Sequence, residues 1–376
     1  PFMFALATRL SGHRSLKVET HAHGPAQDTQ VIIELVTLLL VALVGWALGG
    51  PWAAVIGVVL CATYVPLILI TRTYLSEPLG GLMFVAAVAG ATFARKRGLW
   101  TIAGAGVLAG LTCLARNDLA IGMGVLALAI ALSGSISWRR RLVRLVVYLG
   151  CLVAVVTPWV IYASSKEGRF VPITTSGPDA LFIGTYLPGH GEQFPTVEAF
   201  KSEICKHLPR QCGHYPAGDA APVFAVIQKR YPRLSESAAA TKAALHNISY
   251  YGLHHTGAFI KMLWEKFWNM WSNPWSGGNS GLHPDTSRPQ HWIYFLLAWL
   301  GLLGGAIFIR RWALITAALV LLSVSALNTV FVAQPRDNVR FTPLLFTYGA
   351  VGLWLLISTR VMPALKARRR SRSGVI

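Results

Sequence analysis

The sequence predicts an all-α integral membrane protein with about nine membrane-spanning helices and a large extracytoplasmic segment between the sixth and the seventh. Hydrophobic residues make up 54% of the 376 residues and charged residues only 13%, with a mean hydropathy of +0.50. Soluble domains carry about 25% charged residues. Several apolar runs approach the roughly 20 residues that a helix needs to cross a bilayer. Because these runs are nearly uniformly apolar and do not alternate, they exclude an outer-membrane barrel.

The predicted spans follow one another along the chain with one long interruption. They cover residues 31–48, 52–71, 78–94, 99–115, 119–132, 142–163, 292–309, 312–333 and 341–358. The interruption, residues 164–290, is rich in Gly and Pro in its first part, which is typical of a turn-rich structure. Its later part predicts one or two helices.

Four clusters of basic residues indicate the orientation. They occur at 95–97, 139–141, 310–311 and 366–372. Alternation of the nine helices puts all four on one side, and Lys and Arg accumulate in cytoplasmic loops. We therefore expect the C-terminus in the cytoplasm and the long polar segment outside it. Since this bias explains the net charge of +19, nucleic acid is not an expected partner.

The topology divides the chain into five regions. They are a remnant of an outer loop (1–30), six spanning helices (31–163), an extracytoplasmic segment (164–290), three spanning helices (291–359) and a basic cytoplasmic tail (360–376). The chain begins outside, at Pro1, without a signal peptide. We expect at least one further helix before Pro1; the alternative is a tail that translocates unaided.

An aromatic pattern occupies the last part of the outer segment. Trp264, Trp268 and Trp271 recur at steps of three and four residues, with the charged residues Lys261, Glu265 and Lys266 in the same stretch. This pattern predicts a helix that lies in the membrane interface, where indole rings favour the headgroup level. A core helix of a soluble lobe is the alternative.

Two of the five cysteines lie in the outer segment. An oxidising compartment would permit a disulfide between Cys205 and Cys212. Two alternatives stay open, namely free thiols and a metal site shared with His207 and His214.

Glu77 is an isolated acid at the outer end of a predicted span. Pro78 follows it and starts the next helix, so the carboxylate lies at a helix N-terminus, which favours its ionised form. Such a carboxylate suits metal binding, general base catalysis or contact with a cationic partner. An ordinary charge at a helix start is the alternative.

Arginines lie in two other outer turns. Arg116 precedes the fifth predicted span, and Arg336 and Arg340 lie in a short turn before the ninth. Arginine binds phosphate bidentately and stays charged in any environment, so these side chains are candidates for a lipid phosphate. The alternatives are a structural turn in which Asp118 caps the fifth helix, and charges that merely anchor helix ends.

Three motifs resemble a known family in order and separation. They are YLSEPL at 74–79, GLTCLARND at 110–118 and GRFVPITTSG at 168–177. They are similar to motifs of the C-type (GT-C) multi-spanning glycosyltransferases related to protein O-mannosyltransferases and lipid A aminoarabinose transferases. Residues 335–343 resemble the penultimate outer turn of that family, and residues 1–12 resemble the end of its first outer loop. The resemblance covers most of the chain outside roughly 185–240.

The resemblance implies an inverting transfer of a sugar from a polyprenyl-phosphate donor to a glycan, lipid or protein acceptor. The reaction would take place on the extracytoplasmic face of the plasma membrane, and the Ala-, Arg- and Gly-rich composition favours a bacterial cell envelope. Glu77 would match the second acidic position of the family, beside the donor phosphate or a divalent cation. Arg116 and Arg340 would contact the lipid phosphate, together with Arg336.

The same resemblance assigns the remaining parts. The helix that carries Trp264, Trp268 and Trp271 would form the acceptor cleft, and no cofactor beyond a divalent metal is expected. The main catalytic acid of the family lies early in its first outer loop, which would fall upstream of Pro1. The chain as given would then lack its general base.

Two other functions stay open at this point. A non-catalytic relative or subunit would fit the missing acid. A lipid or sugar transporter would show ionisable residues and interrupted helices near the middle of the membrane, and the apolar runs of this sequence contain no convincing charge.

Overall fold

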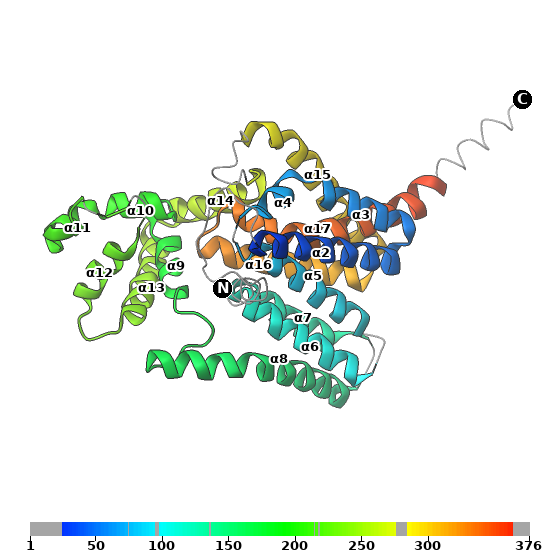
Figure 1. Cartoon of the computed structure of the whole chain (residues 1–376), viewed down its shortest axis with the longest axis horizontal. Coiled ribbons are helices and arrows are strands. Elements are labelled where there is room, and N and C mark those ends of the chain that lie inside the picture. Colours follow the sequence, from blue (N-terminus) through cyan, green and yellow to red (C-terminus); the bar gives the residue numbers. More distant parts are fainter. Residues whose placement is uncertain are drawn as a thin grey trace, which may run out of the picture. The chain divides into compact units, whose positions relative to one another are not determined.

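The computed structural model describes residues 25–73, 75–94, 98–134, 137–213, 215–216, 219–275 and 284–363. Throughout these residues the secondary structure is helical, without strands (Figure 1). The chain forms two compact units. Unit 1 comprises Pro1–Thr157, Asn273–Leu322 and Arg336–Ile376, and unit 2 comprises Pro158–Ser272 and Ser323–Pro335.

Unit 1 is built from apolar helices. They are α2 (Pro25–Gly49), α3 (Pro51–Thr63), α4 (Val65–Ile70), α5 (Glu77–Ala94), α6 (Leu99–Ala115), the 3-10 turn η1 (Asn117–Leu119), α7 (Ala120–Leu132), α15 (Pro284–Gly304) and α17 (Pro335–Leu356). Single π-turns, Gly305–Ile309 and Ile357–Val361, extend α15 and α17. Two helices, α8 (Trp138–Glu167) and α16 (Trp312–Val330), begin in unit 1 and end in unit 2.

Six helices within the described residues are long and apolar enough to cross a membrane. They are Gln27–Gly49, Glu77–Ala94, Trp138–Glu167, Ser287–Ile309, Trp312–Val330 and Pro335–Val361. Three shorter apolar helices cover Pro51–Thr63, Leu99–Ala115 and Asn117–Leu132. The prediction of an all-helical membrane protein is confirmed at this level, whereas the number of nine spans and their orientation stay predictions.

The side chains of α2 show how such a helix divides its surface. Leu35, Leu39 and Leu43 follow one another at four-residue steps and are exposed, while Thr37 and Val41 on the other side are buried. Residues four apart lie on one face of a helix. A continuous exposed leucine stripe is unfavourable in water, and it fits contact with lipid.

The second predicted span, residues 52–71, is interrupted. The chain leaves the helical conformation at Tyr64 (φ −74°, ψ 111°), between α3 and α4. Pro66 has no N–H to donate to the carbonyl four residues earlier, and its ring clashes with that carbonyl, so α3 cannot continue through it. The Gln290 side chain compensates for the break: its Oε1 accepts from Val65 N at 3.1 Å and its Nε2 donates to Thr63 O at 2.6 Å. One amide thus satisfies the backbone groups on both sides of the interruption.

Helices α15 and α17 cross at backbone contact. A Cβ atom on Gly352 would lie 2.0 Å from the carbonyl oxygen of Gly301, and one on Gly349 would lie 2.5 Å from that of Ala298. Only glycine fits at such distances. Small residues allow this approach, which strengthens dispersion contacts between helices where lipid provides no hydrophobic driving force.

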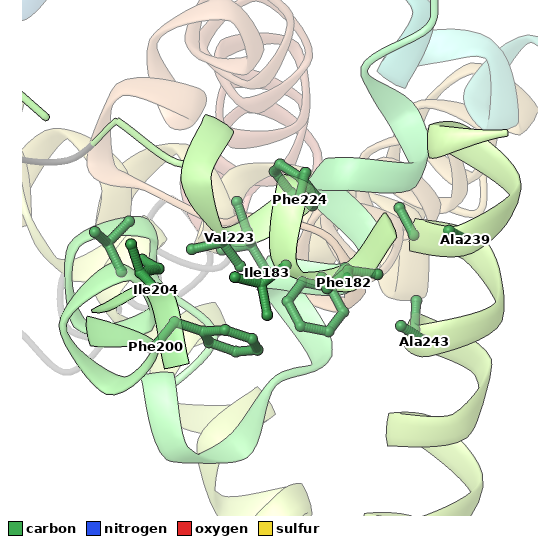
Figure 2. Packing of buried hydrophobic residues seen from close by; sticks show 13 residues of the cluster. Phe182, Ile183, Phe200, Ile204, Val223, Phe224, Ala239 and Ala243 are labelled. Carbon is green, nitrogen blue, oxygen red and sulfur yellow. The ribbon is translucent and has the colours of Figure 1, made fainter. Parts of the chain in front are cut away.

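Unit 2 has its own hydrophobic core. Its helices are α9 (Gly177–Thr185), the 3-10 turn η2 (Leu187–Gly189), α10 (Gln193–Ala199), α11 (Lys201–His207), the 3-10 turn η3 (Pro209–Gln211), α12 (Ala221–Arg230), α13 (Glu236–His254) and α14 (Thr256–Ser272). Figure 2 shows rings of Phe182, Phe200 and Phe224 packed with Ile183 and Val223. The predicted extracytoplasmic segment is therefore largely a folded lobe.

The two cysteines of the predicted extracytoplasmic segment are paired. A disulfide joins Cys205 in α11 to Cys212, directly after η3. Of the two histidines in the metal alternative, His214 lies outside the described residues.

Candidate functional site

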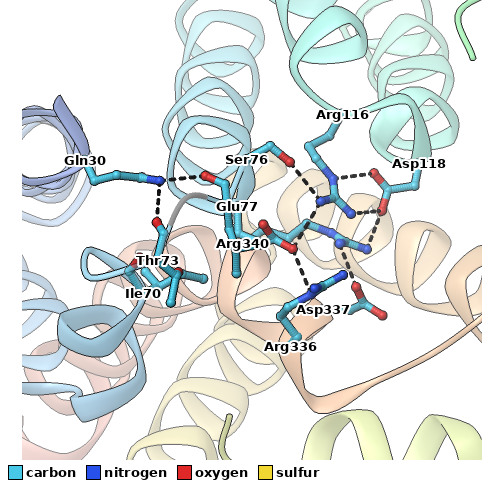
Figure 3. A network of polar contacts seen from close by, with 11 residues as sticks. Gln30, Ile70, Thr73, Ser76, Glu77, Arg116, Asp118, Arg336, Asp337 and Arg340 are labelled. Atoms are coloured by element: carbon cyan, nitrogen blue, oxygen red, sulfur yellow. Dashed lines mark hydrogen bonds and ion pairs between the residues drawn. The ribbon is translucent and has the colours of Figure 1, made fainter. Parts of the chain in front are cut away.

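The four charged residues singled out by the sequence lie together in unit 1 (Figure 3). Glu77 begins α5, Arg116 follows α6, and Arg336 and Arg340 belong to α17. Oε1 of Glu77 is 3.2 Å from Nη1 of Arg116 and 3.0 Å from Nε of Arg336. Residues from two consecutive helices, α5 and α6, and from the distant α17 thus meet around one carboxylate.

Two further acids complete the cluster. Asp118 accepts from Arg116 Nε at 3.2 Å and Nη2 at 3.3 Å, and it also forms an ion pair with Arg340. Asp337 Oδ1 accepts from Arg340 Nη1 at 2.7 Å, one helical turn away. We refer to these three arginines and three carboxylates as the arginine–carboxylate cluster. Sequence reasoning did not assign the two aspartates to the site. The available signal was their spacing, because Asp118 lies two residues after Arg116 and Asp337 lies three residues before Arg340.

Burial divides the arginine–carboxylate cluster into a deep and an open part. The side chains of Glu77 and Arg340 are almost completely buried. Those of Arg116 and Asp118 are 19% and 22% exposed, and that of Arg336 is 41% exposed. A ligand from outside would therefore meet Arg336 first.

The formal charges of the cluster cancel, since three guanidinium groups face three carboxylates. Buried charges are tolerated only when they are paired in this way. Each of the three arginines already contacts a carboxylate, and the expectation that they bind a lipid phosphate stays a prediction. A phosphate would have to exchange with those carboxylates.

The prediction that residues 336–340 form a turn is wrong, while their placement on the outer side stays a prediction. Helix α17 begins at Pro335, where the fixed φ of proline and its missing N–H suit a first helical position, so Arg336 and Arg340 lie within helical turns. The interpretation that Arg340 merely anchors a helix end is likewise wrong, because this side chain is buried and paired. Asp118 lies inside η1 and binds arginines, so it does not cap the fifth helix.

Two glycines in α5 make room for the cluster. A Cβ atom on Gly80 would lie 2.7 Å from Cγ of Arg116, so its absence lets the arginine stem cross the helix. A Cβ on Gly81 would lie 3.3 Å from the carbonyl oxygen of Arg340, which brings α17 against α5. The Gly-Gly pair at positions 80 and 81, separated from Pro78 by one residue, was the available sequence signal of a close approach.

The three tryptophans of the predicted acceptor cleft lie in α14 of unit 2 and share one face of the helix by their spacing, but they differ in burial. Trp264 and Trp268 are 60% and 50% exposed, and their rings are stacked with centroids 6.4 Å apart. Trp271, near the C-terminal end of the helix, is only 8% exposed. Two of the three therefore remain candidates for contact with a membrane or an acceptor.

A buried polar pair in unit 1 was not predicted. A 2.6 Å hydrogen bond joins the hydroxyl of Tyr64, at the break between α3 and α4, and Nδ1 of His291 in α15. Both side chains are completely buried. An ionisable residue inside a candidate span is by itself a functional signal, and sequence reasoning passed over His291 because it placed the span after it.

The divalent cation expected at Glu77 finds no preformed ligand set. Within the described residues, no three His, Cys, Asp or Glu side chains are grouped so that they could hold a metal ion. The Glu77 oxygen with described contacts faces two guanidinium groups. A metal at this position stays a prediction.

The chain matches no known family model, no curated protein sequence and no solved structure. The resemblance to C-type glycosyltransferases therefore stays a prediction. It depends on the order of the three motifs, and the geometry of the arginine–carboxylate cluster is an independent observation beside it.

Proposed function

We propose that this chain is a membrane glycosyltransferase that moves a sugar from a polyprenyl-phosphate donor to an extracytoplasmic glycan, lipid or protein acceptor, with inversion. The observation that supports this proposal is the convergence of Glu77, Arg116, Arg336 and Arg340 from three helices. A polypeptide holds that many charges at the end of apolar helices only at a cost in desolvation, and such groups are typically functional.

The proposed reaction uses the arginines of the arginine–carboxylate cluster and the carboxylate of Glu77. An acceptor hydroxyl attacks the anomeric carbon and gives its proton to a carboxylate, the bond from that carbon to the phosphate oxygen breaks, and a polyprenyl phosphate leaves. Arg336, the most exposed arginine, would contact the phosphate first, and Arg116 would follow. Guanidinium groups held in place stabilise the charge that develops on the leaving group.

Glu77 would act once a phosphate is bound. Once Arg336 turns to a phosphate, the Glu77 carboxylate loses one of its two cationic partners. It then becomes available to a divalent cation or to the acceptor hydroxyl. In the proposed topology the cluster faces the outside of the plasma membrane and the C-terminus lies in the cytoplasm.

Binding of a polyprenyl monophosphate tests the proposal. We expect the purified full chain in detergent to bind this lipid, and Arg336→Gln to weaken binding by about tenfold, as for one lost charge-assisted contact. Arg72→Gln is the matched control, because Arg72 is also exposed and lies in the linker just before Glu77. Absence of binding to the wild-type chain, or equal binding by Arg336→Gln, would contradict the proposal.

Sidedness needs its own experiment. Arg336→Cys, placed in a background that lacks the three free cysteines Cys61, Cys113 and Cys151, should react with a membrane-impermeant maleimide on intact cells. Reaction only after the cytoplasm is opened would place the arginine–carboxylate cluster inside and defeat the proposed enzyme.

A transporter is the second candidate, and one observation favours it. The break at Tyr64 and the buried His291 are an interrupted helix and an ionisable residue in an apolar region, which is the pattern of transporter sites. Uptake of a polyprenyl-phosphate-linked sugar into proteoliposomes, abolished by His291→Phe but not by Arg336→Gln, would favour this alternative over the transferase.

A further inference from the structure

A single glutamine side chain holds the linker that leads to Glu77. Gln30 lies in α2, is 1% exposed, and directs its amide at Thr73 and Leu75, which lie in the linker between α4 and α5 (Figure 3). Its Nε2 donates to the carbonyl oxygen of Thr73 at 2.9 Å and to that of Leu75 at 2.7 Å. Both amide protons of one side chain are therefore used on two nearby residues of the same linker.

These two carbonyl groups lie between α4 and α5, and their bonds to Gln30 are partly buried. A carbonyl removed from water without a hydrogen-bond partner is costly. The direction of the Gln30 amide follows from its neighbours, because the reverse orientation would bring an acceptor against two acceptors. The donors of Gln30 therefore determine where residues 73 and 75 lie.

The linker passes directly into the arginine–carboxylate cluster. Ser76 follows Leu75, and its Oγ accepts from Arg116 Nη1 at 3.1 Å. Glu77 follows Ser76 and meets Arg116 and Arg336. A displacement of the Leu75 carbonyl would be transmitted to both residues, because one and two peptide units separate them from it.

We propose that Gln30 is a positioning residue for Glu77, which it places by fixing the linker at Thr73 and Leu75. This inference rests on the proposed function, because it assigns to Gln30 an indirect part in binding the donor phosphate. Gln30 touches none of the three arginines in the described contacts, so its effect is exerted through the backbone.

The experiment compares Gln30→Met with Gln27→Met in the full chain. Methionine keeps the length of the side chain and removes both donors. Gln27 is the matched control, since it lies one turn earlier in α2 and makes only a 3.5 Å contact to the Arg72 carbonyl. We expect amide hydrogen exchange of residues 73–77 to rise roughly tenfold in Gln30→Met, as for the loss of buried hydrogen bonds, and to stay unchanged in Gln27→Met.

Binding of a polyprenyl monophosphate provides the second measurement. We expect Gln30→Met to weaken it about fivefold and to show less than additive losses with Arg336→Gln, since both changes act on the same Glu77 contact. If Gln30→Met does not fold, Gln30→Asn retains the amide but is too short to reach both carbonyls, and should show the same changes.

The outcomes separate the two proposals. Unchanged exchange in the linker overturns the inference, and so does faster exchange with unaltered lipid affinity. Full additivity with Arg336→Gln would mean that Gln30 acts elsewhere, which also overturns it. If the wild-type chain does not bind the lipid, the proposed function fails, and the exchange measurement alone then decides whether Gln30 fixes the linker.

Discussion

Glu77 and Arg336 form an ion pair of 3.0 Å, although one residue begins α5 and the other lies in the first turn of α17. The pair joins the most buried carboxylate of the arginine–carboxylate cluster to its most exposed guanidinium group. Removal of one partner of such a pair affects ligand binding and also lowers stability, because the partner that remains is left charged and desolvated. Variants must therefore be chosen so that binding and stability can be separated.

Substitution of Arg340 tests how much the buried ion pairs of the cluster contribute to stability. Arg340→Met should lower the free energy of unfolding by about 3–5 kcal/mol, because Asp118 and Asp337 would lose a buried cationic partner. Thermal unfolding in detergent measures the effect. Arg336→Gln should cost clearly less, since its side chain is partly exposed. An Arg340→Met protein as stable as the wild type would show that the buried pairs contribute little.

The crossing of α15 and α17 should depend on its glycines. Gly352→Ala would place Cβ 2.0 Å from the Gly301 carbonyl oxygen, and neither backbone can yield easily, so we expect a loss of about 1–3 kcal/mol. Gly150→Ala in α8 is the control, because nothing lies within 4 Å of its Cβ position. That variant should melt at the wild-type temperature or slightly above it. Equal melting temperatures for the two variants would contradict the close crossing.

Lys266 should make unit 2 sensitive to pH. Its Nζ donates to the carbonyl oxygens of Gly184 and Phe331, at 2.7 and 2.5 Å. Burial lowers the pKa of Lys266 to about 7, and Glu192 acts in the opposite direction. The pKa of lysine in an unfolded chain is about 10.4.

Between these two pKa values the unfolded chain binds more protons than the folded chain. The free energy of unfolding should therefore rise as the pH increases from about 7 towards 10, and should be insensitive to Lys266 below that window. The difference in melting temperature between the wild type and Lys266→Met isolates this contribution, since the other groups titrate in both. Parallel curves of melting temperature against pH for the two proteins, from pH 6 to 10, would show that burial does not shift the pKa of Lys266.

The disulfide provides a test of unit 2 that is independent of the site. Cys205→Ser should lower its stability by about 2–3 kcal/mol, as expected for closure of a loop with a sequence separation of 7. In protein taken from cells, alkylation under denaturing conditions should label Cys61, Cys113 and Cys151 before reduction, and two further thiols after it. Five reactive thiols without reduction would indicate a reducing compartment and contradict the extracytoplasmic placement of the lobe.

Sequence reasoning found Glu77 and the three arginines of the site but not the two aspartates that pair with them. The isolation of Glu77 and of the arginines among apolar runs was visible in one dimension. That Asp118 and Arg340 pair with each other follows from the packing of helices that no local pattern encodes. The contact of Gln30 with the linker is hidden for the same reason, because a glutamine near the start of an apolar helix looks like an ordinary boundary residue.

The errors in helix boundaries have local physical causes. Polar residues after Pro335 lower the mean hydropathy, so a hydropathy criterion starts the last helix at Phe341, whereas hydrogen bonding and the preference of proline for a first turn start it earlier. Pro66 was a visible reason to expect the break at Tyr64, but the surrounding residues are so apolar that the run appeared continuous.

The balance of charge in the arginine–carboxylate cluster has a consequence for kinetics. A group with as many anions as cations has a short-ranged field, unlike an open basic patch, so it does not attract phosphates from a distance. The association rate of an anionic lipid should therefore change little between low and physiological ionic strength. Such a ligand has to arrive by lateral diffusion in the leaflet and trade places with a carboxylate on contact.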